Sequence, residues 1–162
     1  MSAAKISPAA AQDIARRSAE AMWADDRASQ GLGIELVAVG PGTATLAMTV
    51  GEAMTNGHGT AHGGFLFAFA DSAFAFACNS HGDTTVAAQC SITFVRPGQR
   101  GDRLLATARE VTRSGRSGIY DVCISRDGVT IAEFRGHSRT IGGSFIETVP
   151  SAPQSRDPKD TV

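Results

Sequence analysis

The stretch with the clearest chemical potential runs from residue 56 to residue 82 and reads NGHGTAHGGFLFAFADSAFAFACNSHG. Glycines and histidines open it, and an almost wholly apolar run follows that contains a single acid, Asp71. A carboxylate in a buried helix is costly unless it is paired or used in chemistry. Asp71 is therefore a candidate catalytic group, and the alternative is a structural carboxylate bonded to the backbone or to a nearby hydroxyl.

The triplet His62-Gly63-Gly64 stands where a loop is expected to meet this apolar helix. Backbone N–H groups in the first turn of a helix have no partner within the helix, and the helix dipole makes that end positive. Glycine lets a ligand come close to the main chain. Such an end could polarise a carbonyl group that is about to become an oxyanion. The alternative is that both glycines only permit close packing between helix and sheet.

Asp71 follows Gly63 by eight residues, which on an α-helix separates them by roughly 12 Å along the axis. Groups that act on one substrate must lie within hydrogen-bond reach of it. Two copies of the helix, antiparallel across a two-fold axis, would place the N-terminus of one beside the middle of the other. If both residues serve one site, we expect at least a homodimer with its sites at the subunit interface.

Two helices are expected to frame this stretch, an amphipathic one near residues 7–26 and a central one at residues 62–79. The central helix is apolar on nearly every face and is therefore expected to be enclosed. Runs of β-forming residues between turn signals predict strands at residues 34–39, 43–50, 84–95, 103–113, 118–126 and 129–141. By itself, this order supports an α+β fold with an antiparallel sheet curled around one helix.

The chain divides into three parts, a helical segment at residues 1–30, a globular domain at residues 31–146 and a tail at residues 147–162. The tail contains several prolines and charged residues and is expected to be disordered.

Composition limits the classes of function. Of the 162 residues, 42% are apolar and 19% are charged, as in an ordinary soluble domain, and a net charge of -1 favours neither nucleic acid nor membrane as a partner. The N-terminus lacks the apolar core of a signal peptide, and no apolar run is long enough to span a bilayer. Three widely spaced cysteines and four scattered histidines suggest neither a disulfide framework nor a metal site. We therefore expect a cytoplasmic protein.

The stretch at residues 56–82, together with ITFVRPG at residues 92–98 and FRGHSRTIGG at residues 134–143, resembles the hotdog-fold acyl-CoA thioesterases. Within that family it is most similar to the PaaI-type enzymes of phenylacetate degradation, and the similarity covers about residues 31–143. The resemblance implies a hotdog fold, in which an antiparallel β-sheet wraps around a long central α-helix.

The resemblance also implies roles for four residues of this sequence. Asn56 would help to hold the thioester carbonyl or a water molecule. The N–H group of Gly63 would polarise the thioester oxygen, with His62 shaping that corner. Asp71, from the partner subunit, would activate water as a general base or attack directly. Some relatives place a serine or threonine on the following strand to orient the water, whereas this sequence has Ala87 at the matching position.

The substrate side of the site is expected to involve arginines, because coenzyme A carries phosphates. Arg113 and Arg116, in the turn TRSGRSG, are the expected contacts, with solvated surface charge as the alternative. Gly64 is expected to let the substrate approach the main chain. The acyl group is expected between the two central helices of a dimer, near the apolar side chains Phe65, Phe69 and Phe74.

Together these features predict a homo-oligomer, a dimer at least and a tetramer as the expected form. It would hydrolyse arylacetyl-CoA thioesters, including ring-hydroxylated phenylacetyl-CoA, to the free acid and CoA. Neither a metal nor another cofactor is expected, because an N–H donor and one carboxylate suffice for an electrophilic thioester carbonyl. Two alternatives remain open: a 3-hydroxyacyl-thioester dehydratase that pairs His62 with Asp71, and a non-catalytic acyl-CoA-binding sensor.

Overall fold

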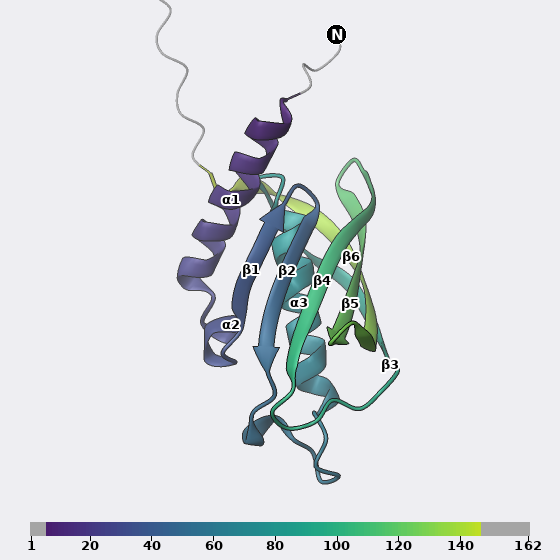
Figure 1. Ribbon diagram of the computed structural model, residues 1–162. Coiled ribbons are helices and arrows are strands. Elements are labelled where there is room, and N and C mark those ends of the chain that lie inside the picture. The colour runs from purple at the N-terminus through teal and green to yellow at the C-terminus, as the bar shows by residue number, and fades with distance from the viewer. Residues whose placement is uncertain (1–5, 147–162) are drawn as a thin grey trace, which may run out of the picture.

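The computed structural model describes residues 6–146 (Figure 1). The helices are α1 (Pro8–Asp25), α2 (Arg27–Gly31), the 3-10 helix η1 (Glu52–Met54) and α3 (Gly63–Asn79). The strands are β1 (Glu35–Gly40), β2 (Thr43–Thr49), β3 (Asp83–Phe94), β4 (Arg103–Ser114), β5 (Ser117–Arg126) and β6 (Val129–Ser144). All the predicted helices and strands are confirmed. The sequence did not predict α2 and η1, which are too short to give a periodic pattern, and the predicted disorder at residues 147–162 lies outside the described residues.

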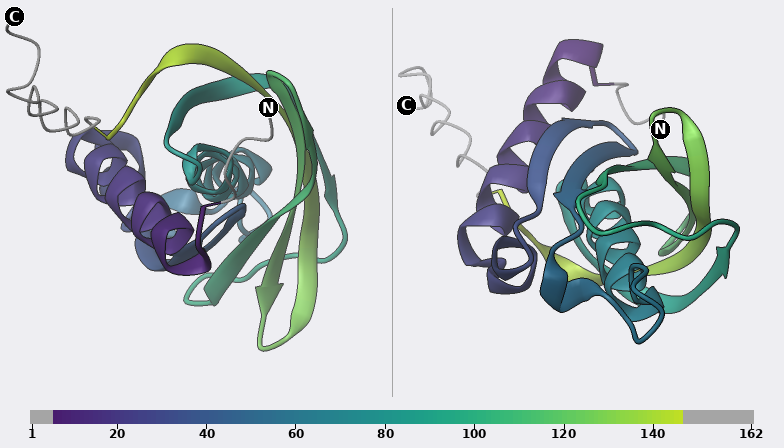
Figure 2. Two further views of the ribbon diagram at one scale, coloured as in Figure 1. Left: turned by 90° about the horizontal axis from the view of Figure 1, so that it is seen from above. Right: turned by 60° about the horizontal axis from the view of Figure 1, so that its bottom comes forward.

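The six strands form one antiparallel sheet in the order β1-β2-β4-β5-β6-β3. Seen from above, the sheet curls around α3, which lies along its concave side (Figure 2). Alternate residues of β4 and β5 face the helix and are buried, namely Leu104, Ala106, Ala108, Tyr120, Val122 and Ile124. Such alternation is typical of a sheet with one face on the core. The predicted hotdog arrangement of one antiparallel sheet around one helix is confirmed.

The N-terminal helix α1 packs against β1 and α3. Ser7 caps its first turn, and Pro8 stands at the first helical position, where the missing N–H group costs nothing. Ala15 is fully buried, and the Trp23 ring lies 6.0 Å from the ring of Phe76 on α3. The apolar face of α1 is therefore continuous with the core. Among the described residues, no helix combines the length and apolarity needed to cross a bilayer.

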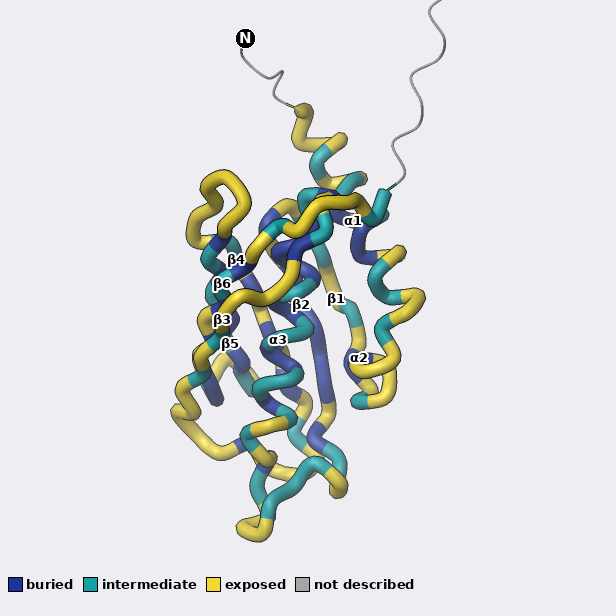
Figure 3. The backbone as a smooth tube through the Cα atoms, turned by 180° about the vertical axis from the view of Figure 1, so that it is seen from behind, coloured by how far each residue is buried: buried dark blue, intermediate teal, exposed yellow. Residues whose placement is uncertain are grey.

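One side of α3 is only partly covered, which corrects the prediction of a helix enclosed on nearly every face. The sheet of a single chain wraps the other sides, so a partly exposed strip remains along Phe67, Ala68, Asp71, Ser72 and Ala75. From behind, the partly exposed turns of α3 lie close to the exposed strand β3 (Figure 3). β3 is an edge strand with exposed apolar side chains, as Val86 is 42% and Phe94 52% exposed. An apolar strip beside an unpaired strand edge is typical of a subunit interface.

Candidate active site

The His62 side chain caps the first turn of α3 and hydrogen-bonds with the N–H group of Gly64, but not with that of Gly63. The Nδ1 atom of His62 accepts a hydrogen bond from the N–H of Gly64 at 3.0 Å. Within residues 6–146, no acceptor lies in hydrogen-bond reach of the Gly63 N–H. The positive end of the helix dipole therefore acts through the Gly63 N–H. Of the two predicted glycines, Gly63 is the one that can donate to a substrate oxygen.

Gly63 also packs closely against a side chain of β3. A Cβ atom at this position would lie 2.7 Å from Cζ of Phe94. Since the Phe94 side chain is half exposed at the end of its strand, the ring could move, but in the present geometry only glycine fits. The close-packing interpretation of the glycine and the N–H donor interpretation are thus compatible.

The loop before α3 is built around Asn56. Its Oδ1 accepts from the N–H groups of His58 at 2.9 Å and Thr60 at 3.2 Å, an arrangement that fixes a tight turn. Its Nδ2 makes one hydrogen bond among the described residues, to Oγ1 of Thr60 at 3.0 Å. The loop is anchored by the N–H of Ala61, which donates to the carbonyl of Gly98 at 2.9 Å. The Asn56 oxygen therefore holds the loop, and a second N–H of its amide is left for a ligand.

Asn56 and Gly63 line one cavity of about 370 Å³, so the structure brings these two predicted residues together. Sequence reasoning did not select two further residues there. Thr60 is one, and Arg96 is the other, with its Nη1 donating to the Thr130 carbonyl at 2.9 Å. In the sequence, Arg96 stands directly before the turn that anchors the Asn56 loop, and this position could have indicated its role in the cavity.

Asp71 lies in the middle of α3 and lines a different cavity, of about 300 Å³. Among the described residues its carboxylate has one polar contact, from Sγ of Cys90 to Oδ1 at 3.8 Å. Burial raises the pKa of Asp71, and the hydrogen bond from Cys90 offsets part of that rise. The structure thus gives Asp71 neither a backbone nor a hydroxyl partner in the described part of the chain, so the structural-carboxylate alternative is not supported.

A β-bulge in β3 turns Cys90 toward Asp71. The partners of Ala87 and Gln89 on β6 are consecutive residues, so Ala88 is an extra residue in the ladder. One extra residue shifts the alternation of side chains by one position, and Cys90 faces the helix as a result. Ala87 lines the Asp71 cavity, so the position at which some relatives would carry a hydroxyl is apolar here.

Within one chain, Asp71 is apart from the other predicted catalytic residues. Its cavity shares no lining residue with the cavity of Asn56 and Gly63. This separation agrees with the axial spacing of roughly 12 Å along α3. The ring of His62 bonds back to the first turn, so the pairing of His62 with Asp71 that a dehydratase would need is not formed in one chain.

The structure does not place the predicted arginines in either cavity. Nη1 of Arg113 lies 3.9 Å from Oδ2 of Asp83, and Nε of Arg116 donates to the Thr140 carbonyl at 2.9 Å. Both belong to the β4–β5 hairpin near the C-terminal end of α3. Across residues 6–146, no group of three or more His, Cys, Asp or Glu side chains could hold a metal ion.

Comparison with known proteins identifies the family of the chain. A family model described as the thioesterase superfamily matches residues 58–132. The chain is 44% identical over 130 residues to the acyl-coenzyme A thioesterase PaaI of Escherichia coli (strain K12), covering 80% of this chain and 93% of that protein. This chain belongs to the thioesterase superfamily and is of the PaaI type.

Solved structures of similar proteins share the fold. The structure of Escherichia coli PaaI, from the phenylacetic acid degradation operon, superimposes with a TM-score of 0.81, covering 82% of this thioesterase and 97% of that chain. A mutant structure of the phenylacetic acid degradation protein PaaI from Thermus thermophilus is 40% identical, with a TM-score of 0.70 and coverage of 72% and 100%. A Streptococcus mutans protein bound to acetyl-CoA is 25% identical, with a TM-score of 0.66 and coverage of 68% and 90%.

Proposed function

We propose that this thioesterase hydrolyses arylacetyl-CoA thioesters, including ring-hydroxylated phenylacetyl-CoA, to the free acid and CoA. The observation that carries the proposal is the division of α3 between an available Gly63 N–H in one cavity and a buried carboxylate, Asp71, in another. The name of the 44% identical Escherichia coli relative supports the choice of acyl-CoA, and its operon supports an arylacetyl group. The three free thiols suit a reducing cytoplasm.

The active site would form between two subunits. We infer that the partly exposed strips of two α3 helices face each other antiparallel, so that Gly63 lies beside Asp71 of the partner subunit. The strip is continuous with the exposed edge strand β3, which offers unpaired backbone groups to a second copy. A dimer is the smallest assembly that completes the site, and a tetramer is the expected form.

The reaction would proceed by general-base hydrolysis. The thioester oxygen accepts the N–H of Gly63, and the partner's Asp71 removes a proton from a water molecule that attacks the carbonyl carbon. The oxyanion that forms is stabilised by the same N–H and by the helix dipole. When it collapses, the C–S bond breaks and the CoA sulfur takes the proton back from Asp71. Burial raises the pKa of Asp71, which makes its carboxylate a stronger base than an exposed aspartate.

The phosphates of CoA would lie on the Gly63 side of the site. Among the described residues, Arg96 is the one arginine that lines that cavity. Arg113 and Arg116 remain proposed phosphate contacts, and in a dimer they would have to reach the substrate from the partner subunit. Gly64 contributes by permitting close approach, because its N–H is already bonded to His62.

The first test is release of free thiol from phenylacetyl-CoA by wild type and Asp71→Asn. The substitution keeps size and removes the charge, and we expect kcat to fall about 100-fold or more, since general-base catalysis contributes that much. Asp127→Asn is the matched control, because Asp127 is exposed and its positive φ of 49° tolerates asparagine. Equal thiol release by Asp71→Asn and wild type would overturn the proposed mechanism. Binding of CoA esters without any thiol release by wild type would favour the sensor.

Mixed subunits test whether the site is shared. Gly63→Pro removes the N–H donor, and Asp71→Asn removes the base, so each variant alone should be inactive. After equal amounts are unfolded and refolded together, half of the dimers should be mixed, each with one intact site. Activity should therefore return to about a quarter of wild type for sites shared across a two-fold axis. If the mixture stays as inactive as its parts, both residues act within one chain.

A further inference from the structure

The cavity that contains Asp71 is lined by residues from four parts of the chain. Asp71, Phe74, Ala75 and Cys78 come from α3, and residues 84–87 come from β3. Met22 of α1 and Phe145, beyond the end of β6, complete the lining. Asp71 is its one charged residue. One charged group in a mostly apolar pocket is the arrangement expected where a reacting group meets an apolar part of its substrate.

In this lining, the side-chain amide of Asn79 is hydrogen-bonded to the backbone of Thr85. Oδ1 of Asn79 accepts from the N–H of Thr85 at 2.8 Å, and its Nδ2 donates to the Thr85 carbonyl at 2.9 Å. Burial raises the pKa of Cys78 to about 12, so its thiol stays protonated and behaves as a small apolar group. Away from Asp71, most of the lining therefore consists of apolar side chains and of polar groups that are already hydrogen-bonded, which favours a hydrocarbon group as the occupant.

Its size fits an aromatic ring. The volume of about 300 Å³ exceeds the roughly 150 Å³ of apolar cavities that bind benzene. A phenyl ring with its methylene group would therefore enter, whereas an acetyl group would leave most of the volume without contacts.

We propose that this cavity between α1, α3 and β3 binds the acyl group, and that Met22 limits the size of the aryl group accepted. The inference rests on the proposed function and extends it to the acyl side of the same site. The Gly63 cavity of one subunit would hold the thioester carbonyl and the CoA arm. The acyl group would pass Asp71 of the partner subunit and enter the cavity beyond it.

Met22 and Phe145 both lie outside residues 58–132, which the thioesterase family model matches. Of the proposed catalytic residues, His62, Gly63 and Asp71 lie inside that range, and Asn56 lies just before it. Acyl selectivity would thus be set by flanking segments that can change without disturbing the catalytic end of α3. Met22 suits this role because its unbranched side chain is partly buried and adapts to its neighbours.

The test compares the ratio of kcat/KM between two substrates in each variant, rather than the rate with one substrate. Met22→Trp should fill the cavity and lower kcat/KM for phenylacetyl-CoA by about 10- to 100-fold relative to butyryl-CoA, the range expected for steric selection in an apolar pocket. Met22→Ala should enlarge the cavity and raise the preference for 1-naphthylacetyl-CoA over phenylacetyl-CoA. Ala21→Trp is the matched control, because Ala21 is the exposed neighbour on α1 and the same side chain there should leave both ratios unchanged.

Binding separates failure of this inference from failure of the proposed function. In the Asp71→Asn background, Met22→Trp should weaken binding of phenylacetyl-CoA, measured by calorimetry, and leave binding of free CoA unchanged. If wild type releases no thiol but this difference is seen, the acyl pocket stands and the thioesterase proposal fails. If wild type is active and both Met22 variants keep the wild-type substrate ratios, or if phenylacetyl-CoA and CoA lose affinity equally, the acyl-pocket inference is wrong.

Discussion

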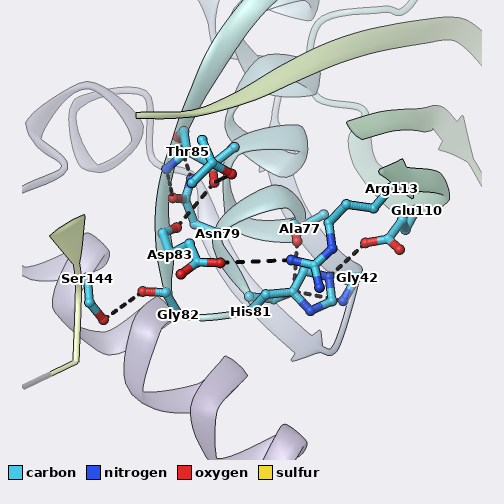
Figure 4. A network of polar contacts seen from close by, with 12 residues as sticks. Gly42, Ala77, Asn79, His81, Gly82, Asp83, Thr85, Glu110, Arg113 and Ser144 are labelled. Carbon is cyan, nitrogen blue, oxygen red and sulfur yellow. Dashed lines mark hydrogen bonds and ion pairs between the residues drawn. The ribbon is translucent and has the colours of Figure 1, made fainter. Parts of the chain in front are cut away.

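At its C-terminal end α3 is held by a dense polar network, whereas at its N-terminal end an N–H group faces a cavity. Beyond Asn79, whose amide bonds to Thr85, the Oγ of Ser80 accepts the N–H of Gly42 at 2.7 Å and donates to the Ala77 carbonyl at 2.7 Å. These contacts join the helix end to the β1–β2 turn and to β3 (Figure 4). The side-chain polar groups of Asn79 and Ser80 at this end all have hydrogen-bond partners.

Two carboxylates show the same contrast. Oε2 of Glu110 lies 2.7 Å from Nε2 of His81 and accepts from the Tyr120 hydroxyl at 2.9 Å. Burial raises the pKa of Glu110, but the hydrogen bonds from His81 and Tyr120 outweigh it, and the net pKa is lowered. Asp71 is also partly buried, but its one polar contact within residues 6–146 is the weak one from the Cys90 thiol, and its pKa is raised.

The difference indicates which end serves stability and which serves chemistry. A buried polar group with full partners stabilises the fold, whereas one left without a partner costs free energy. The N–H of Gly63 and the carboxylate of Asp71 carry this cost in free energy, and a substrate and a water molecule would supply their hydrogen-bond partners. The predicted effects of substitution should therefore divide between activity and stability along the length of α3.

The largest effect on activity should come from removing the Gly63 N–H. Gly63→Pro keeps the helix, because proline suits the first helical position and the His62 ψ of 132° suits a residue before proline. We expect kcat/KM for phenylacetyl-CoA to fall about 100- to 1000-fold, the usual cost of one oxyanion donor. Gly63→Ala is the control, since it adds the same Cβ beside Phe94 but retains the N–H. Equal losses in the two variants would mean that packing, and not the N–H, matters here.

The opposite pattern is expected at the C-terminal end. Glu110→Gln should lower the free energy of unfolding by about 1–3 kcal/mol, because it weakens the hydrogen bonds from His81 and Tyr120, while the folded variant keeps its kcat. A lowered pKa means that Glu110 contributes its stability above its ordinary value of 4.5 and loses it as the pH falls below that. Denaturant unfolding at pH 7 and at pH 3 to 4 checks both statements.

Glu20→Gln provides the comparison for Glu110→Gln. Glu20 forms an exposed ion pair with Arg16 at 2.6 Å, which should contribute little to stability because water screens it. A loss of kcat in folded Glu110→Gln, or a stability loss no larger than that of Glu20→Gln, would contradict the division of α3 into two functional halves.

The sequence predicted the parts of this contrast that depend on local pattern. The apolar run and its glycine start predicted α3, and runs of β-forming residues between turn signals predicted the strands. Features that depend on the order and register of strands were missed. β3 pairs with β6 at the edge of the sheet, and the bulge at Ala88 in this ladder turns Cys90 toward Asp71. Arg96, just after β3, lines the Gly63 cavity, whereas Arg113 does not.

Glycines explain another difference between prediction and structure. The strand predicted at residues 129–141 continues as β6 to Ser144. Gly142 and Gly143 have φ angles of 96° and 90°, a conformation that glycine adopts without strain. They bring Ser144 next to Gly82, whose carbonyl accepts from the Ser144 hydroxyl at 2.8 Å. A pair of glycines normally predicts the end of a strand, and the sequence alone did not indicate this continued contact.

The smallest effect should come from Cys90, the one polar partner of Asp71 among the described residues. Its thiol favours the ionised carboxylate and so offsets part of the rise that burial causes in the pKa of Asp71. Cys90→Ala removes the donor, so the acidic limb of the kcat/KM profile should move to higher pH. Cys90→Ser replaces the thiol with a stronger hydrogen-bond donor and should keep the limb at or below the wild-type position.

The rate at optimum pH should stay within about tenfold of wild type in both Cys90 variants, since a single hydrogen bond contributes about 1 kcal/mol. The other group near Asp71 that can titrate is the Cys78 thiol, whose pKa of about 12 keeps it protonated over the range of the assay. A shift of the acidic limb can then be assigned to Asp71 itself. If the limb stays in place in Cys90→Ala, either the bulge does not hold the thiol against the carboxylate or Asp71 is not the group whose ionisation controls the rate. Loss of the limb in Asp71→Asn would separate these two explanations.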